Sequence, residues 1–328
     1  MSIALVFSPQ GSQAIGMGRA LAEASPAARR VYEAADDALG WPVSRLCWDG
    51  PADRLDDTRQ TQPALVATAL ACLRALEERL VAAGARLSAA LVAGHSVGEY
   101  VALVAAGVLT TDDAVRLVAR RGELMADAAG DGGMTAVIGL ERQTVERAVD
   151  ALARPTELVV ANDNAPGQVV ISGRRDALQA VEAALRETGA RRLIRLPVSG
   201  PFHSPLMAPV ADELERAFES VPWRDADPPV VSNVTAQPER DARRLRALLT
   251  EQVRSPVEWV GCVKRMADEG VDTFVECGPG TALVGMVRRI LPAARTLNVA
   301  DPASLAETAE ALLGRVGTPA ATTAGAGC

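Results

Sequence analysis

A serine flanked by glycines constrains the fold of this chain more than any other feature. An apolar run at residues 90–93 leads directly into Gly94-His95-Ser96-Val97-Gly98, and a helical pattern follows. This strand–turn–helix order is the setting of the G-x-S-x-G nucleophile elbow, in which the serine hydroxyl projects from the sheet edge. The helix N-terminus and the N–H of Val97 can then stabilise developing negative charge. The alternative interpretation is an ordinary glycine-rich turn.

Short apolar strands alternate with longer helical patterns in the rest of the chain, which predicts an α/β protein with a mainly parallel sheet. Aromatic residues make up only 3%, so the core must be aliphatic. Strands are expected at residues 3–7, 89–93, 229–232, 273–276 and 296–299. Helices are expected at residues 62–83, 97–106, 111–128, 206–221, 242–253, 257–269 and 281–290.

The stretch between residues 133 and 197 has a different pattern. Its order is strand (134–139), helix (141–153), strand (157–161), strand (168–172), helix (176–188) and strand (191–196). This βαββαβ order is the ferredoxin-like arrangement. We therefore expect a hydrolase-like large subdomain at 1–130 and 198–316, an inserted ferredoxin-like small subdomain at 131–197, and a disordered tail at 317–328.

Composition excludes several classes of function. The net charge of -7 argues against nonspecific nucleic-acid binding. The sequence has no uncharged apolar run of about 18 residues, so no membrane span is predicted. The N-terminus resembles a first strand and not a signal peptide. Five widely spaced cysteines without a CxxC pair indicate reduced thiols and no metal site. We expect a cytoplasmic protein.

A nucleophilic serine needs a base, and the chain has only two histidines. His95 is adjacent to Ser96, and neighbours at a turn point in different directions, so it is poorly placed as the base. His203 remains, in a loop that opens a helix just after the inserted stretch. The alternative for a lone histidine is a structural or surface residue. A third residue, usually an acid, would orient the imidazole. Asp163, Asp225 and Asp227 are candidates in loops, but their spacing in the sequence favours none of them.

Several separated motifs occur in a recognisable order. They are Gln10-Gly11-Ser12-Gln13, Gln62-Pro63-Ala64-Leu65, Gly94-His95-Ser96-Val97-Gly98-Glu99, Arg121-Gly122-Glu123-Leu124-Met125, the run from Ala161 to Gln168, Phe202-His203-Ser204-Pro205-Leu206-Met207, Ser232-Asn233-Val234-Thr235 and Glu276-Cys277-Gly278-Pro279-Gly280. Together they resemble the malonyl-CoA:acyl carrier protein transacylases and the related acyltransferases of polyketide synthases, including those that act in trans. The resemblance covers residues 3–300.

The resemblance implies a catalytic set. Ser96 and His203 match the family's Ser–His dyad, and the histidine is oriented by a main-chain carbonyl that falls at Gln252. This implied carbonyl would explain why no acid was found. The family's oxyanion hole consists of two backbone N–H groups, which match Gln10 and Val97.

The resemblance also implies a substrate-binding set. Arg121 matches the arginine that pairs with the malonyl carboxylate, and arginine offers a permanently charged, bidentate partner. Arg120 beside it is the alternative, a solvated helix residue. The other residues assigned to substrate binding are Gln62, at the start of a helix and in the acyl pocket; Asn162, in a loop near the pantetheine arm; Phe202, an aromatic typical of members that use malonyl; and His95, beside the nucleophile.

One departure from the family pattern lies at the first loop. The family reads Phe-Pro-Gly-Gln-Gly where this chain reads Phe7-Ser8-Pro9-Gln10-Gly11. Proline fixes φ near -65°, where glycine permits positive values. Gln10 keeps its N–H, so the oxyanion hole can survive, but the path of the loop next to the acyl pocket, and with it the exact donor, stays open.

The expected activity is ping-pong transfer of a malonyl group from malonyl-CoA to the phosphopantetheine thiol of an acyl carrier protein, in fatty acid or polyketide biosynthesis. No metal or cofactor is expected, because the coenzyme A thioester is itself the substrate, and the chain is expected to act as a monomer. Three alternatives remain open: an acyl-thioester hydrolase, an acyltransferase for an unusual acyl group, and a non-catalytic partner that retains the fold.

Overall fold

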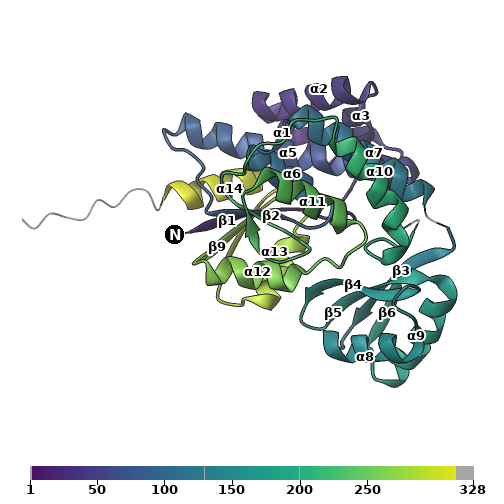
Figure 1. Cartoon of the computed structure of the whole chain (residues 1–328). Coiled ribbons are helices and arrows are strands. Elements are labelled where there is room, and N and C mark those ends of the chain that lie inside the picture. Colours follow the sequence, from purple (N-terminus) through teal and green to yellow (C-terminus); the bar gives the residue numbers. More distant parts are fainter. Residues whose placement is uncertain (1, 129, 199, 315–328) are drawn as a thin grey trace, which may run out of the picture.

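A six-stranded, mostly parallel sheet forms the centre of the larger part of the molecule. The computed structural model describes residues 2–128, 130–198 and 200–314 (Figure 1). The strand order is β10-β9-β1-β2-β7-β8, and only the short β8 pairs antiparallel. The strands are β1 (Ile3–Phe7), β2 (Leu91–Gly94), β7 (Val230–Val231), β8 (Pro238–Glu239), β9 (Thr273–Cys277) and β10 (Arg295–Val299).

Strand β1 brings the site loops together. Phe7, its last residue, pairs with Gly94 at the end of β2 and with Cys277 at the end of β9. The carboxyl ends of these parallel strands therefore meet at one edge, which is where open α/β sheets place their ligands. The loops after β1 and β2 carry Gln10 and Ser96.

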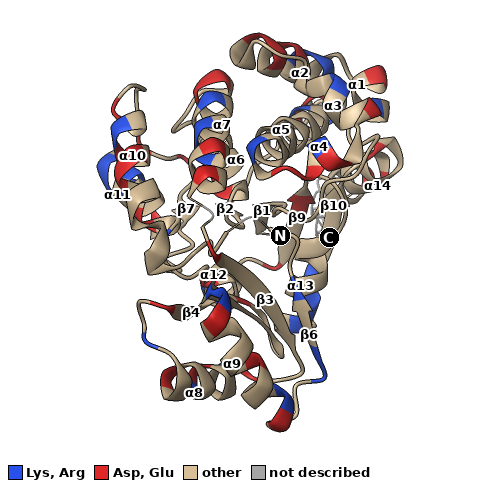
Figure 2. Cartoon of the chain, turned by 90° about the vertical axis from the view of Figure 1, so that its right-hand side faces the viewer, with Lys and Arg blue, Asp and Glu red and all other residues tan. Residues whose placement is uncertain are grey.

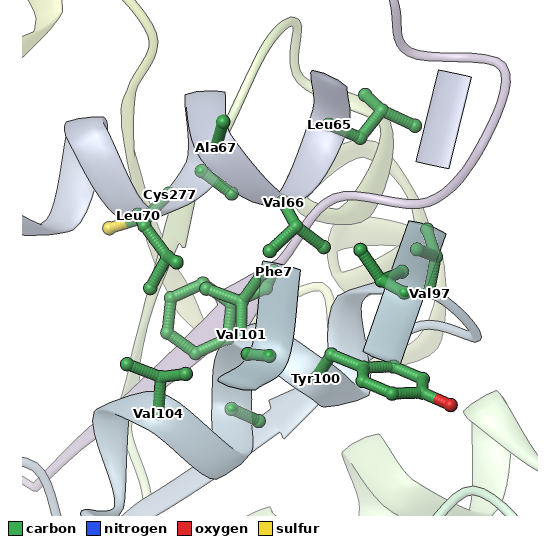
Figure 3. Close-up of a cluster of buried hydrophobic side chains, with 14 of the residues drawn as sticks. Phe7, Leu65, Val66, Ala67, Leu70, Val97, Tyr100, Val101, Val104 and Cys277 are labelled. Atoms are coloured by element: carbon green, nitrogen blue, oxygen red, sulfur yellow. The ribbon is translucent and has the colours of Figure 1, made fainter. Parts of the chain in front are cut away.

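Helices cover both faces of this sheet. Ile3, Leu5 and Phe7 join one buried cluster, while the alternate residues Ala4 and Val6 join another on the opposite face. Figure 3 shows Phe7 among aliphatic side chains, as the scarcity of aromatics predicts. The helices are α1 (Arg19–Ala24), α2 (Pro26–Leu39), α3 (Val43–Asp49), α4 (Ala52–Asp56), α5 (Thr58–Ala82), α6 (Gly98–Ala105), α7 (Thr111–Asp127), α10 (Ala208–Phe218), α11 (Ala242–Gln252), α12 (Trp259–Asp268), α13 (Ala282–Ile290) and α14 (Pro302–Leu313).

The start of α5 corrects the sequence interpretation. The helix begins at Thr58 and not at Gln62, so Pro63 lies inside it and not in its first turn. Asp57 caps the helix by accepting a hydrogen bond from Arg59 N–H (2.9 Å), and the Thr61 hydroxyl donates to Asp57 O (2.9 Å). These bonds stabilise a helix start ahead of the proline, which itself removes one intrahelical bond.

The smaller part contains an antiparallel four-stranded sheet with the order β4-β5-β3-β6. Its elements are β3 (Gly132–Ile138), α8 (Arg142–Leu152), β4 (Leu158–Ala165), β5 (Gln168–Arg174), α9 (Arg175–Glu187) and β6 (Arg192–Arg195). The βαββαβ order and this pairing are ferredoxin-like, so the predicted fold class, a parallel sheet with an inserted ferredoxin-like unit, is confirmed. The exact boundaries at 131 and 197 stay a prediction.

Strand β4 is longer than the sequence indicated. It continues to Ala165 through two register shifts, so Asn162 lies in a strand and not in a loop. The reason is that the backbone of Val257 pairs with the edge of β4 that does not face β5. Asp163 N–H donates to Val257 O (3.0 Å), and Val257 N–H donates to Ala161 O (2.8 Å). Arg142 of α8 also donates to both carboxylate oxygens of Glu258.

Charged side chains lie mostly on the helices that surround the two sheets (Figure 2). Within the described ranges, no helix combines the length and apolar character needed to cross a membrane. The predicted disordered tail at 317–328 lies outside the described residues.

Candidate active site

The predicted nucleophile elbow is present between β2 and α6. Ser96 has φ 53°, in the left-handed region, and His95 N–H donates to Phe7 O (3.1 Å). A Cβ at Gly94 would lie 1.9 Å from the Gly98 carbonyl, and a Cβ at Gly98 would lie 2.2 Å from Phe7 O. Only glycine fits at both positions, because the backbones approach so closely there.

Ser96 and His203 form a hydrogen-bonded pair. Ser96 Oγ lies 2.7 Å from His203 Nε2, and His203 Nδ1 lies 2.8 Å from the main-chain oxygen of Gln252. A carbonyl can only accept, so Nδ1 carries the proton and Nε2 of the neutral ring accepts the serine O–H. His203 also has φ 57°, and its N–H donates to Val253 O (3.0 Å).

Burial keeps the His203 imidazole neutral. It lowers the pKa of His203 to about 3, and the positive charge of Arg121 acts in the same direction. The Gln252 carbonyl opposes the shift but does not cancel it. A neutral imidazole can take a proton from Ser96 at any pH near neutrality.

The three acids that spacing left open do not contact His203. Asp163 lies 3.4 Å from Arg142 Nη1, and Asp227 lies 3.0 Å from Arg240 Nη1. Asp225 accepts a hydrogen bond from the N–H of Ala242. The imidazole is therefore oriented by a main-chain carbonyl, as the resemblance implied.

Arg121 reaches the nucleophile from α7. It is 1% exposed, and it donates to Gln62 Oε1 (2.6 Å), Ser96 Oγ (3.1 Å) and Gln252 Oε1 (3.1 Å). All three acceptors are neutral, its Nε has no partner, and no carboxylate of the described residues forms an ion pair with it. A buried cation without a direct counter-ion is prepared to receive a carboxylate. Arg120, by contrast, is exposed and pairs with Glu123.

Two buried polar residues near the nucleophile received no role from the sequence. Asn233 accepts a hydrogen bond from Ser96 N–H (2.7 Å) and donates to Gly94 O (2.7 Å), so it holds the elbow. Glu99 Oε2 accepts from Gln252 Nε2 (2.6 Å), and burial raises the pKa of Glu99 to about 7. Both belong to motifs noted in the sequence, but a motif does not show which side chains turn inward.

Both predicted oxyanion donors are free. Among the described residues, no acceptor takes a hydrogen bond from the backbone N–H of Gln10 or Val97. The Ser8-Pro9 departure is accommodated by a buried contact: Ser8 Oγ donates to Glu276 Oε1 (3.0 Å). Glu276 also accepts from the N–H groups of Leu283 and Val284 at the start of α13, so the first loop is tied to that helix.

A cleft of ≈ 250 Å³ opens over the dyad, between the two parts of the molecule. Of the predicted substrate-binding residues, Arg121, Phe202, Asn162 and His95 line it. Gln62 does not line the cleft; it is fully buried behind Arg121, and its amide nitrogen lies 3.4 Å from Met125 Sδ. The remaining walls include Pro9, Gln10, Met125, Asn164, Gln168 and Met286.

His95 faces the cleft and not the dyad. Its Nε2 lies 2.7 Å from Asn164 Oδ1, and its ring packs 5.5 Å from the Trp259 ring, centroid to centroid. Burial lowers the pKa of His95 to about 4. No group of three His, Cys, Asp or Glu side chains suited to a metal occurs within the described part of the chain.

Comparison with known proteins gives a consistent result. Residues 4–310 match the model of the acyl transferase domain family. The malonyl CoA-acyl carrier protein transacylase of Bacillus subtilis is 41% identical over 92% of this chain and 95% of its own length, and that of Escherichia coli K12 is 38% identical over 94% and 98%.

Solved structures are similar over the same span. The acyl-carrier-protein S-malonyltransferase of Burkholderia pseudomallei 1710b superposes with a TM-score of 0.90, at 40% identity, over 94% of this chain and all of that one. A malonyl-transacylase in complex with its type II polyketide synthase acyl carrier protein also gives 0.90, at 38% identity, over 95% of this chain and all of that one.

Proposed function

The chain belongs to the acyl transferase domain family, and we propose that it transfers malonyl groups from malonyl-CoA to an acyl carrier protein through Ser96 and His203. The observation that carries this proposal is the convergence on one oxygen. Ser96 Oγ contacts the neutral base and the unpaired guanidinium of Arg121 at once. The proposed pathway is fatty acid or polyketide synthesis, and a similar malonyl-transacylase was solved with a type II polyketide synthase acyl carrier protein.

In the first half-reaction, His203 Nε2 takes the proton of Ser96, and Oγ attacks the thioester carbonyl of malonyl-CoA. The N–H groups of Gln10 and Val97 stabilise the tetrahedral oxyanion. As the intermediate collapses, His203 returns the proton to the leaving sulfur, and coenzyme A departs as the thiol. The product is a malonyl ester on Ser96.

In the second half-reaction, the phosphopantetheine thiol of the carrier protein enters the same cleft. His203 takes the thiol proton, the sulfur attacks the ester carbonyl, and the Ser96 oxygen leaves with that proton. Asn162 lines the cleft on β4, which supports its proposed contact with the pantetheine arm. Arg121 binds the malonyl carboxylate throughout, since its side-chain hydrogen bonds within the described residues go to neutral oxygens and the charge of Glu99 reaches it only without direct contact.

Arg121 also favours transfer of malonyl over the hydrolase alternative. An enzyme that merely releases acyl groups to water gains nothing from a buried cation that must be desolvated. Action as a monomer, in the cytoplasm and without metal or cofactor, remains a prediction.

Intact-mass measurement tests the proposal. The protein is incubated with malonyl-CoA, and a phosphopantetheinylated carrier protein is then added, with the unmodified carrier as control. We expect a malonyl adduct on wild type, none on Ser96→Ala, and passage of the adduct only to the modified carrier. Release of free malonate would identify a hydrolase, and the absence of both the adduct and free malonate would identify a non-catalytic protein.

A further inference from the structure

The side chain of Gln252 connects the parts of the site. Its Oε1 accepts from Arg121 Nη2 (3.1 Å), and its Nε2 donates to Ser96 O (3.0 Å). The main-chain oxygen of the same residue accepts from His203 Nδ1 (2.8 Å). One fully buried residue thus contacts the nucleophile's backbone, the base and the substrate-binding cation.

These contacts require one orientation of the Gln252 amide. If it were flipped, its NH₂ group would face the N–H donors of Arg121, and its oxygen would face the oxygen of Ser96. Buried groups placed in this way lose their hydrogen bonds and pay the desolvation penalty. The contacts with Arg121 and Ser96 therefore favour the observed orientation, and a third contact restrains the amide in the same way.

Glu99 supplies that restraint from the first turn of α6. It is 2% exposed, and its Oε2 accepts from Gln252 Nε2 at 2.6 Å, the shortest bond that the amide makes. The same oxygen lies 3.4 Å from the N–H of Asn233, the residue that holds the elbow. The ionised carboxylate can only accept, so it bonds the NH₂ group of Gln252 and favours the orientation in which Oε1 turns to Arg121.

We propose that Glu99 is a positioning residue: by anchoring the Gln252 amide, it holds the Arg121 guanidinium in the place where the acyl carboxylate binds. This inference rests on the proposed function and deepens it. Glu99 does not touch the reacting atoms, and its effect passes through Gln252. The His203 imidazole is held by the main-chain oxygen of Gln252, and the amide contacts Ser96 only at its backbone oxygen, not at Oγ.

The test separates positioning from packing by comparing two donors. Glu99→Met keeps the length of the side chain but removes the acceptor, whereas Glu99→Gln keeps an acceptor oxygen. We expect Glu99→Met to lower kcat/KM for malonyl-CoA on the order of 10²-fold, as small misplacements do, and to change kcat/KM for acetyl-CoA far less. Glu99→Gln should keep the malonyl-to-acetyl ratio within about 3-fold of wild type, a difference below 1 kcal/mol.

A second variant covers the case in which Glu99→Met does not fold. Gln252→Met removes the amide but keeps the main-chain oxygen. The double variant Glu99→Met/Gln252→Met removes the carboxyl and the amide together, so neither of these two groups is left buried without the other. We expect Gln252→Met to lower the malonyl-to-acetyl ratio, and the double variant to lower it no further, since the two residues act as one unit. The matched control is Glu123→Gln, an exposed carboxylate on α7 that pairs with Arg120.

Equal losses for both donors, or additive losses in the double variant, would overturn the role of Glu99. So would a loss of the malonyl-to-acetyl ratio in Glu99→Gln equal to that in Glu99→Met. Wild type in the same assay tests the proposed function separately: if it forms no malonyl adduct, the function is wrong whatever the Glu99 variants do.

Discussion

Arg121 Nη2 lies 3.1 Å from Ser96 Oγ, the same oxygen that lies 2.7 Å from His203 Nε2. The residue that recognises the acyl group and the residue that activates the nucleophile therefore meet at one atom. Once a malonyl group is esterified to Oγ, its carboxylate is only three carbons from that atom and can turn back to the guanidinium. This short distance between Oγ and the guanidinium suits a small diacid such as malonyl and does not suit a longer diacid.

Replacing His203 with alanine should slow both half-reactions by about 10²–10⁴-fold, the usual cost of losing a general base. The fold should be retained, because the hydrogen bond from the backbone N–H of His203 to Val253 O does not need the ring. Stopped-flow release of coenzyme A measures the first half-reaction, and malonyl transfer to the carrier measures the second. Unchanged rates would place the base elsewhere.

Replacing Arg121 with alanine should reduce kcat/KM for malonyl-CoA and narrow the preference over acetyl-CoA. A neutral acyl chain leaves the wild-type guanidinium buried without a partner, and the variant removes that penalty. Arg120→Ala, an exposed neighbour on the same helix, is the control and should behave as wild type. The assignment fails if both arginine variants keep the wild-type preference.

Replacing Phe202 with serine should admit methylmalonyl-CoA. The Phe202 ring lines the cleft and is 4% exposed, and overpacking a tight site costs about 1–3 kcal/mol, or roughly 5- to 150-fold in selectivity. The measurement is kcat/KM for malonyl-CoA and methylmalonyl-CoA in wild type and variant. A wild type that accepts both donors equally would remove the steric argument.

Acylation should show no midpoint near pH 6.5, the usual pKa of histidine. The pKa of His203 is lowered to about 3, so the base stays neutral and competent as the pH falls from 8 to 5. Single-turnover acylation should be measured in Glu99→Gln, since this variant lacks the carboxyl whose pKa lies at about 7. A rate that halves near pH 6.5 in this variant would show that His203 titrates normally.

Glu99→Gln should also change how stability depends on pH. The folded-state pKa of Glu99, about 7, is above the ordinary value of 4.5, so the folded chain binds the extra proton between these values. Its contribution is present below pH 4.5 and is lost as the pH rises through 7, by up to about 3 kcal/mol. The difference in unfolding temperature, variant minus wild type, should therefore be more positive at pH 8 than at pH 5. Thermal unfolding at both values is the measurement, and an equal difference at each would contradict it.

The sequence predicted the fold where periodicity and turn chemistry agree. The smaller sheet, five strands of the larger sheet and the elbow could be placed in advance, because alternating apolar patterns and the glycines at 94 and 98 leave few alternatives. The two-residue strand β8 was missed. Helices α1 to α4 and α14 were missed. Helix α2 carries clear end signals: Ser25 accepts from Ala28 N–H, Pro26 opens the helix, and Gly40 ends it with φ 70°. Helix α14 likewise begins with a capping box at Asp301. Helices α1, α3 and α4 have only 5 to 7 residues, too few for a periodic pattern.

The site was predictable only as far as the motifs assign roles. Ser96, His203 and Gln252 meet as expected, but the contact of Gln62 with Arg121, instead of with the cleft, depends on how α5 and α7 pack. Glu99 could not be found from its spacing, since its partner Gln252 lies 153 residues away along the chain. A long-range contact between two buried side chains leaves no local pattern.

The backbone pairing of β4 with Val257 has a further consequence for how the enzyme selects acyl groups. The same short segment carries the carbonyl of Gln252 that orients His203 and the residue that joins the two parts of the molecule. Rotating the small part away would break two backbone hydrogen bonds and the grip of Arg142 on Glu258, close to the base. These contacts oppose rotation of the small part, so we expect donors to be selected by whether they fit the cleft in its present shape.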